Sequence, residues 1–208
     1  MSVAKMPRIL DILNPADFYL YYEAIYRECE LNDCTISGDG EKIALKQMIF
    51  RNVCFKEACL RYSDIVDVIF INCDLSNIDF RDSSIHRTEF IDCKILGTSF
   101  TDTSLVSVAF KNCNGKYTNF RFSKLKDVEF EKVSLESSDF LNSKFTKVKF
   151  KEANLTLSQF SGTSLMGIDF TSSVIDGINA RVEDINGVVI TIMQSVEIAK
   201  IVGAVIKV

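Results

Sequence analysis

The chain has 208 residues, of which 47% are hydrophobic, with two prolines and no tryptophan. This composition excludes a disordered or fibrous chain, and the formal net charge of −4 excludes a general nucleic-acid binder. The N-terminal stretch MSVAKMPRILDILNPADF has no apolar run of signal-peptide length, and no other stretch is long enough to span a bilayer. We expect the seven cysteines to be reduced thiols and the protein to be cytoplasmic.

In chain order, residues 1–47 are expected to form an N-terminal cap. The pentads RECEL and NDCTI (27–36) place Cys29 and Cys34 at a small position and Leu31 and Ile36 at an apolar one. Both pentads are one residue out of phase with the repeat that begins at residue 48. The glycines and charges of SGDGEK (37–42) predict a loop where the phase changes, and a short helix is expected over residues 15–26.

Residues 48–190 repeat every five positions. Every fifth residue from Phe50 to Ile190 is Phe, Leu, Ile or Ala, except Gly115, and the residue two positions earlier is mostly small or β-branched. Neither an α-helix nor an ordinary strand keeps a five-residue period. Two inward residues in each pentad imply that the backbone turns a corner in every pentad. Four pentads then make one square coil.

The apolar centres sort into four columns when they are grouped by their place in the coil. Positions 50, 70, 90, 110, 130, 150 and 170 are all Phe, and the opposite column, from 60 to 160, is Leu followed by five Phe. The two columns between them are mainly Leu and Ile. Coils stack at roughly 4.8 Å, so rings in one column can stack with an offset.

These pentads resemble the pentapeptide-repeat family, whose consensus is A(D/N)LXX with Leu or Phe at the centre. KEANL (151–155) is close to that consensus, and CDL (73–75) and SDF (138–140) fit it well. The resemblance covers at least residues 48–190. It implies an all-β fold, a right-handed quadrilateral parallel β-helix, but no particular function, because members of the family differ in their partners.

The period changes in the last segment, residues 191–208. Residues 193–202 suit a short helix that Gly203 would end, and AVIKV (204–208) suits a final strand. A helical projection places Gln194, Glu197 and Lys200 on one side. The apolar residues on the other side are Val196, Ile198, Ala199 and Val202.

This apolar face has two interpretations: it caps the last coil of a monomer, or it pairs two chains. The segment resembles the C-terminal helix and strand through which quinolone-resistance (Qnr-type) pentapeptide proteins pair end to end. The uninterrupted register is similar to the loop-free Gram-positive type of that group. We favour a homodimer, because the monomer would leave apolar residues on a free strand edge.

No constellation of residues predicts catalysis, a cofactor or a metal site. Cys73, Cys93 and Cys113 form a ladder within disulfide reach. Parallel side chains and a reducing compartment favour simple packing, however, and a straight ladder does not converge on zinc. His86, the one histidine, follows a centre and should point outward. A phenylalanine-filled interior leaves no substrate pocket, and no phosphate-binding glycine loop is present, so we expect no enzyme and no cofactor.

Gly115 is the one centre without a side chain. Tyr117 or Phe122 could fill the gap, or the coil could kink there. A local packing defect is favoured over a functional notch.

Because three of five side chains point outward, we expect function to depend on their charges. Residues 56–92 carry 4 basic and 8 acidic groups, whereas residues 93–155 carry 11 and 7. The candidate partner-binding acidic face comprises Asp64, Asp67, Asp74, Asp79, Asp82, Glu89 and Asp92. The basic segment includes Lys124, Lys126, Lys144, Lys147, Lys149 and Lys151.

Two functions fit such a rod. One is a structural scaffold that binds an unidentified macromolecular partner. The other follows from the resemblance: Qnr-type relatives are DNA mimics that bind DNA gyrase or topoisomerase IV and confer quinolone protection. Seven coils span about 34 Å, over which DNA carries about 20 negative charges, against −4 for this chain. The scaffold is therefore favoured, with a protein partner, no direct nucleic acid and no membrane.

Overall fold

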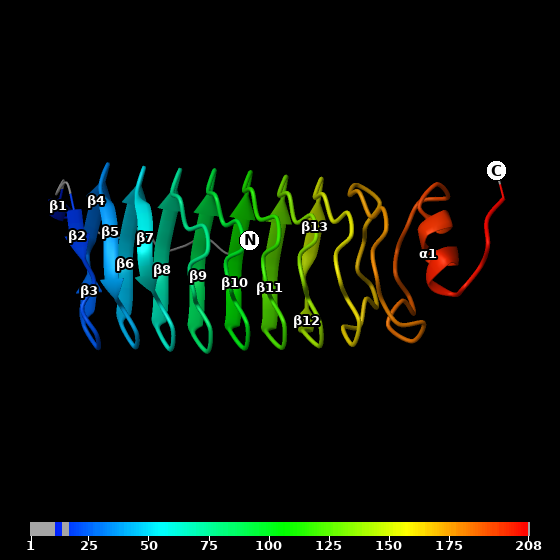
Figure 1. Cartoon of the computed structure of the whole chain (residues 1–208), viewed down its shortest axis with the longest axis horizontal. Helices are drawn as coiled ribbons and strands as arrows, with labels where there is room; N and C mark the ends of the chain where they lie inside the picture. The colour runs from blue at the N-terminus through cyan, green and yellow to red at the C-terminus, as the bar shows by residue number, and fades with distance from the viewer. Residues whose placement is uncertain (1–10, 14–16, 208) are drawn as a thin grey trace.

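The chain forms short strands and one helix that follow one another along a rod (Figure 1). The computed structural model describes residues 11–13 and 17–207. The elements are β1 (Asp11–Leu13), β2 (Asp17–Tyr19), β3 (Ile25–Arg27), β4 (Cys29–Asn32), β5 (Thr35–Asp39), β6 (Ala44–Arg51), β7 (Cys54–Cys59), β8 (Asp64–Ile71), β9 (Ser84–Ile91), β10 (Ser104–Lys111), β11 (Lys124–Glu131), β12 (Lys144–Thr146), β13 (Lys149–Lys151) and α1 (Ser195–Ile201).

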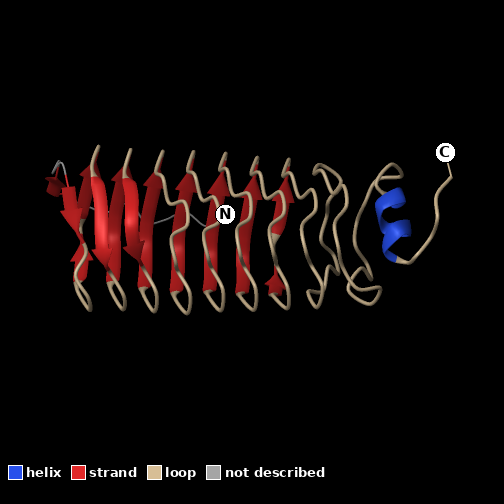
Figure 2. Cartoon of the chain, viewed as in Figure 1, coloured by secondary structure: helices blue, strands red, loops and turns tan. Residues whose placement is uncertain are grey.

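The strands pair in parallel with their counterparts in the next coil. One sheet runs β1-β4-β6-β8-β9-β10-β11-β12, with β13 also paired to β11 and β3 to β6, and a smaller sheet runs β2-β5-β7. Ile65 pairs with Ile85, and Phe70 pairs with Phe90, so each centre lies above its column neighbour. Beyond β13 the coils continue with isolated bridges such as Asn154 to Val174, and they are drawn as loops in Figure 2.

Each coil turns at residues in the left-handed backbone conformation. Asp67, Asn72, Asn77 and Asp82, each two positions after a centre, have φ angles of 57°, 51°, 61° and 58° and form the four corners of one coil. Asn and Asp adopt this conformation more readily than most residues. The predicted fold, a quadrilateral parallel β-helix, is confirmed.

The two phenylalanine columns stack as predicted. The ring centroids of Phe90 and Phe110 lie 4.8 Å apart with planes 6° apart, and those of Phe120 and Phe140 lie 4.8 Å apart at 2°. Rings of opposite columns meet edge to face, as Phe110 and Phe120 do at 6.1 Å. The four-sided coil is therefore filled by aromatic contacts both along the rod and across it.

Phe122 lies outside these columns for a backbone reason. It occupies a corner, with φ of 59°, and its side chain is 48% exposed. Phe122 and Tyr117, which is 65% exposed, therefore do not fill the gap at Gly115. Thr118 and Ile95 fill it instead, because a Cβ built on Gly115 would lie 3.0 Å from Thr118 Oγ1 and 3.1 Å from both Ile95 Cγ1 and Cδ1. The coil continues without a kink, since the Gly115 amide donates to the Ser134 carbonyl at 2.7 Å.

The N-terminal coil changes register near its end. Leu31 pairs with Phe50 and Ile36 with Phe55, whereas Gly38 pairs with Ala58, which places the shift between Ile36 and Gly38. The helix predicted over residues 15–26 is wrong for the described residues 17–26, where β2 and the start of β3 lie. Left-handed corners at Glu23 and Glu28, both with φ of 55°, bend the chain too often for a helix to form.

The C-terminal helix begins and ends within the predicted range. Gly203, with φ of 83°, donates its amide to the Lys200 carbonyl at 3.0 Å, and the Ala204 amide donates to the Ala199 carbonyl at 2.9 Å. These two bonds form a Schellman motif, in which Gly closes a helix without strain from a side chain. The predicted final strand is wrong for the described residues 204–207, which have no strand partner within the chain.

Candidate interaction surface

The interior of the rod leaves no room for a substrate, because each coil is filled by side chains such as Phe80, Phe100 and Phe120, all 0% exposed. The two hollows of the rod considered next lie on its outer surface. One of about 470 Å³ is lined in part by Lys147, Lys149 and Lys151, and another of about 350 Å³ is lined in part by Tyr19 and Cys59. Recognition by this protein must therefore use its outer surface.

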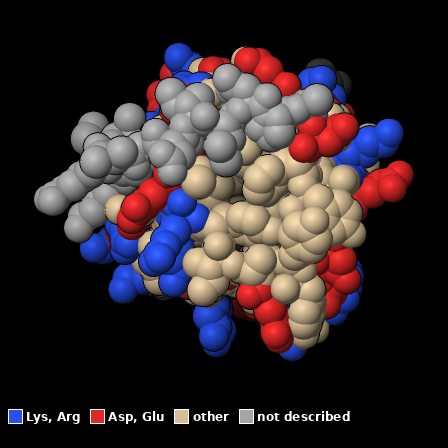
Figure 3. Space-filling model, turned by 90° about the vertical axis from the view of Figure 1, so that its left-hand side faces the viewer, with Lys and Arg blue, Asp and Glu red and all other residues tan. Residues whose placement is uncertain are grey.

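The structure does not bring the seven predicted acidic residues together on one face. Asp64 aligns with Ser84 and Glu89 with Ala109, on two different walls of the coil. Asp74 and Asp79 belong to two further ladders, which run through Lys94 and Ser99 respectively. An end-on view shows acidic and basic side chains interspersed around the rim (Figure 3). These acids are close together in the sequence and therefore along the rod axis, but the coil distributes them over different walls around that axis.

Most of these carboxylates are also paired with a cation. Asp64 pairs with Lys46 at 3.4 Å and Asp74 with Lys94 at 3.8 Å. Asp67, Asp79 and Glu89 bond to Arg87, Arg81 and Lys111. Burial opposes ionisation of Asp79, but hydrogen bonds from the Arg81 side chain and backbone lower the pKa of that carboxyl below its usual range. Asp82 and Asp92 are exposed corner residues.

The basic residues gather over the adjoining strands β11, β12 and β13, on two neighbouring walls of the coil. Lys124 and Lys126 lie on β11, and Lys144 on β12 is the ladder neighbour of Lys124. We call the lysine face the set Lys124, Lys126, Lys144, Lys147, Lys149 and Lys151. Lys147 pairs with Asp127 at 3.9 Å and Lys151 pairs with Glu129. Among the described residues, no ion-pair partner lies within 4.0 Å of the remaining four ammonium groups.

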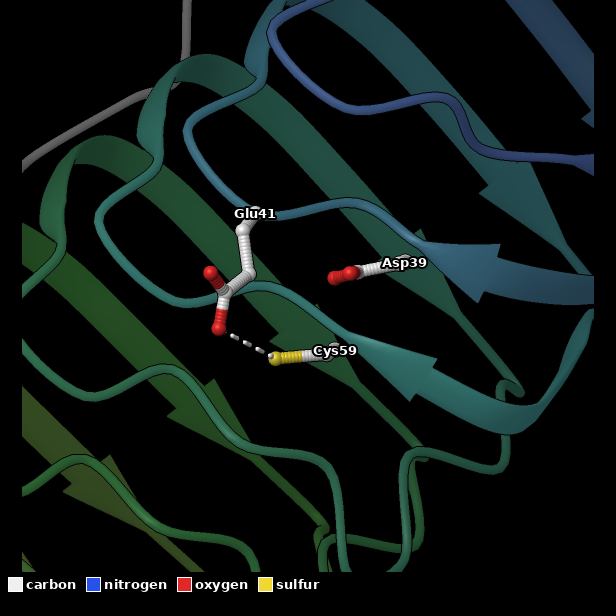
Figure 4. Close-up of side chains that lie close together, drawn as sticks. All are labelled: Asp39, Glu41 and Cys59. Carbon is white, nitrogen blue, oxygen red and sulfur yellow. Dashed lines mark hydrogen bonds between the residues drawn. The ribbon is translucent and has the colours of Figure 1, made fainter.

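One mixed group of potential metal ligands was not anticipated from the sequence. Asp39, Glu41 and Cys59 place one ligand atom each within 4.8 Å of one another (Figure 4). The Cys59 thiol donates to Glu41 Oε1 at 3.7 Å, and Glu41 also pairs with Arg61 at 3.3 Å. Burial raises the pKa of the Cys59 thiol, which disfavours the thiolate form that a metal requires. The protonated thiol and Arg61 therefore already satisfy Glu41.

The cysteine ladder packs inside the coil. Cys73, Cys93 and Cys113 are buried free thiols. The Cys73 thiol lies 3.4 Å from the carbonyl oxygen of Phe50, in the coil before it, and the Cys93 thiol lies 3.5 Å from that of Phe70. These thiols act as small side chains that donate weak hydrogen bonds from one coil to the previous one.

His86 lies on the outer surface of the sheet, with Val66 and Val106 as its neighbours in register. It is half-buried there. This position agrees with the expected outward orientation.

Helix α1 closes the end of the rod, and the polar residues Gln194 and Glu197 contact the last coils. The Gln194 side chain donates to the carbonyls of Phe170 and Ser173, at 2.8 Å each. Glu197 accepts the Gly177 amide at 2.9 Å, and Ile198 packs against the core. Hydrogen bonds to backbone groups of the last coils thus hold Gln194 and Glu197 against the end of the rod, since buried polar groups need partners.

In this arrangement the four residues predicted at the dimer interface have different environments. Val196 and Val202 are exposed, at 41% and 54%, and Ala199 is half-buried. Ile198 instead contacts the core of its own chain. Two large apolar side chains before the helix, Ile192 and Met193, are 91% and 84% exposed.

We expect the cap to loosen in acid. The Lys200 ammonium, and after it the Gly177 amide, lowers the pKa of Glu197 below its usual range. A lowered pKa in the folded state stabilises the cap above the unfolded pKa of about 4.3, and this stability is lost as pH falls through the folded value. The protection factors of residues 195–201 in hydrogen exchange, which correct for the pH dependence of the intrinsic rate, should fall below about pH 4.3, and Glu197→Gln should remove that dependence. Equal acid sensitivity of both proteins would contradict this role.

Comparison with known proteins identifies the repeat. A model of the pentapeptide repeat region matches residues 63–140, and a model of eight pentapeptide repeats matches residues 134–171. No curated protein matches the sequence. None of the helices in the described part of the chain is long and apolar enough to cross a membrane.

The chain is similar to solved structures at low sequence identity. A trypsin-treated variant of QnrB1, a plasmid-mediated fluoroquinolone resistance protein, is 18% identical with a TM-score of 0.50, covering 95% of this chain and 100% of that one. HetL, a pentapeptide repeat protein involved in heterocyst differentiation regulation in the cyanobacterium Nostoc sp. strain PCC 7120, is 12% identical with a TM-score of 0.35, over 84% and 87% of the two chains. Together with the stacked pentads, the family matches show that the chain belongs to the pentapeptide-repeat family.

Proposed function

We propose that this chain is a non-enzymatic cytoplasmic scaffold, a rigid rod whose lysine face binds a protein partner with an acidic surface. The observation that carries the proposal is the contrast between the two kinds of charge. The candidate acids are spread over four ladders and mostly paired, whereas Lys124, Lys126 and Lys144 are adjacent and have no ion-pair partner within the described part of the chain.

Unpaired like charges held on a rigid sheet repel one another, so an acidic partner relieves that repulsion and is attracted over a long range. The hollow beside Lys147, Lys149 and Lys151, of about 470 Å³, adds a recess into which a side chain of the partner fits. The rigid coil keeps the ammonium groups in register, which limits the entropy lost on binding.

Charge reversal tests this proposal. A triple variant, Lys124→Glu with Lys126→Glu and Lys144→Glu, should lose the proteins that the native chain captures from lysate at low salt. A matched control reverses three lysines outside the lysine face, Lys46, Lys56 and Lys94, and should retain them. Raising the salt concentration should weaken capture by the native chain and by the control variant, because salt screens the attraction between the lysines and an acidic partner. If both variants capture the same proteins as the native chain, the lysine face is not the binding site.

A second candidate is binding to DNA gyrase or topoisomerase IV, with protection from quinolones. The uninterrupted rod and its fold similarity to QnrB1 support it; the paired state of the candidate acids weighs against DNA mimicry. If the mimic hypothesis is correct, the purified protein should cause or relieve inhibition of gyrase supercoiling. Reversal of Asp74, Asp79 and Asp82 to Lys should abolish the effect. The absence of any effect at micromolar protein would remove this candidate.

We also propose that residues 191–208 mediate a homodimer, with Val196, Ala199 and Val202 at the interface. Their exposure, and that of Ile192 and Met193 beside them, supports this proposal, because contiguous exposed apolar side chains mark interaction sites. Ile198 contributes by holding the helix on the last coil.

A further inference from the structure

The backbone ladder of the rod is interrupted between one pair of coils. No backbone hydrogen bond or bridge joins residues 144–152 to residues 164–171, although the structure describes every residue of both segments. The other two walls of the same pair of coils are joined normally: the Phe160 amide, for example, donates to the Asn179 carbonyl at 2.6 Å. The strands drawn in Figure 2 end at this place, with β13. We call this interruption the ladder break.

The ladder break is not the end of the ladder. In the pair of coils that follows, the Leu165 amide donates to the Asp184 carbonyl at 2.8 Å. The Phe170 amide likewise donates to the Val189 carbonyl at 2.9 Å. The break is therefore confined to one pair of coils and to two adjoining walls.

The core side chains explain why the two coils tilt apart. In the column of Phe160 the next centre is Ala180, which lets the coils approach each other on that wall. On the opposite wall the rings of Phe150 and Phe170 lie 5.5 Å apart and are tilted by 42°, whereas those of Phe130 and Phe150 lie 5.1 Å apart at 7°. Because each coil is a rigid frame, approach on one wall opens the wall opposite to it.

The ladder break leaves backbone amides without their usual partners. In regular coils the amide of each centre and of each corner donates to the next coil, as the Leu155 and Leu157 amides do at 2.8 Å. The matching amides on the two open walls belong to Phe145, Lys147 and Phe150. None of these three donates to the next coil, which the structure describes in full. Since an unpaired backbone amide away from water is costly, these groups are placed to donate to a ligand.

The hollow of about 470 Å³ lies over the ladder break, because residues from both coils line it. Lys149 belongs to one coil and Gly167 to the other. Val148 and Phe150 also line the hollow, although they point inward and are only 5% and 2% exposed. The hollow therefore reaches down to the backbone. A Cβ built on Gly167 would meet no atom within 4 Å, so that side of the hollow is open.

The charges around the hollow favour an anion. Lys149 is exposed, and no ion-pair partner lies within 4.0 Å of its ammonium group among the described residues. Lys147 and Lys151 also line the hollow, and each pairs with one carboxylate of β11. The acid in the lining, Asp169, accepts bonds from the Thr171 amide and hydroxyl at 2.8 and 2.6 Å, within its own coil. Unpaired amides beside an unpaired ammonium group form a site that suits an oxyanion.

We propose that the ladder break binds a carboxylate of the partner, from an Asp or Glu side chain in an acidic segment that lies across the lysine face. This inference rests on the proposed function. The carboxylate accepts hydrogen bonds from the amides of Lys147 and Phe150 and pairs with the ammonium group of Lys149. Because backbone donors have fixed positions, the ladder break sets the register at which the partner binds, which flexible lysine side chains alone do not.

Hydrogen exchange of the native chain tests the ladder break itself. The amides of Lys147 and Phe150 should have protection factors at least about tenfold lower than those of Leu155 and Phe160, which lie in the same coil. Equal protection of the two pairs would show that the ladder is closed in solution, and it would overturn the proposal.

An NMR titration of the full chain with hexaglutamate tests the ligand, with hexaglutamine as the neutral control peptide. Hexaglutamate should shift the amide resonances of Lys147 and Phe150, and Lys149→Gln should weaken the binding read from them by about threefold. Lys132→Gln, at an exposed corner outside the hollow, is the matched control and should leave that binding unchanged. Asp169→Asn keeps an acceptor oxygen and removes a negative charge, so it should tighten the binding by about the same factor.

The same titration distinguishes failure of this site from failure of the lysine face. Shifts at Lys124 and Lys126 without shifts at Lys147 and Phe150 would overturn the ladder-break site and leave the lysine face as the binding surface. The reverse pattern would count against the lysine face alone. Shifts at the break with inorganic phosphate but not with hexaglutamate would overturn the proposal, because the site would then take phosphate. The absence of any shift would overturn both.

Discussion

Phe110→Ala is expected to lower the free energy of unfolding by about 3–5 kcal/mol. Phe110 is 0% exposed, and its ring stacks on Phe90 at 4.8 Å and on Phe130 at 5.0 Å. It also meets Phe100 and Phe120 edge to face, at 5.9 and 6.1 Å. Neighbouring coils are tied to each other by backbone hydrogen bonds and cannot collapse into the cavity, so both the transfer and the cavity costs apply.

Urea denaturation followed by circular dichroism measures this loss. Phe122→Ala is the matched control, because it removes the same ring from a corner where the side chain is 48% exposed. That variant should change the free energy of unfolding by no more than about 0.5 kcal/mol. Similar losses for the two variants would show that the stacked columns contribute no special stability.

Val202→Asp is expected to convert a dimer into a monomer. Light scattering of the native chain should give twice the chain mass of 23.5 kDa. Val202 directly follows α1, is 54% exposed, and is not among the residues that pack against the core. A carboxylate there would be desolvated without a partner in the interface, which costs far more than it does in water.

Two further variants distinguish loss of the dimer interface from loss of the cap on the last coil. Ile198→Asp should also give monomers, but it should in addition weaken the closure of the last coil, because Ile198 packs against the core. Val182→Asp, at a residue that is 56% exposed on the side of the rod, should leave the dimer intact. A native chain that scatters as a monomer would disprove the proposed interface.

The surface charges show that a high density of charge along the sequence does not by itself predict a charged face of the coil. The acids of residues 56–92 are concentrated in sequence, but Asp64, Asp74 and Glu89 lie on different walls of the coil. Lys124 and Lys144 are neighbours on the surface because they occupy the same position in successive coils. A charge cluster in a solenoid is therefore recognised from its spacing along the ladder and not from its density along the chain.

The sequence by itself determined the coil. A five-residue period of inward side chains fits one regular backbone, in which every pentad turns one corner, and each pentad in this sequence has that same pattern. It also determined the aromatic columns, which follow from that period. The tertiary structure alone decided the ends and the outer surface. Gln194 turned toward the rod because its side chain donates to the carbonyls of Phe170 and Ser173 in the coil before it, and Asp64 and Glu89 lie on different walls because each pentad turns a corner. These outcomes depend on contacts between segments far apart in the chain, which no local period encodes.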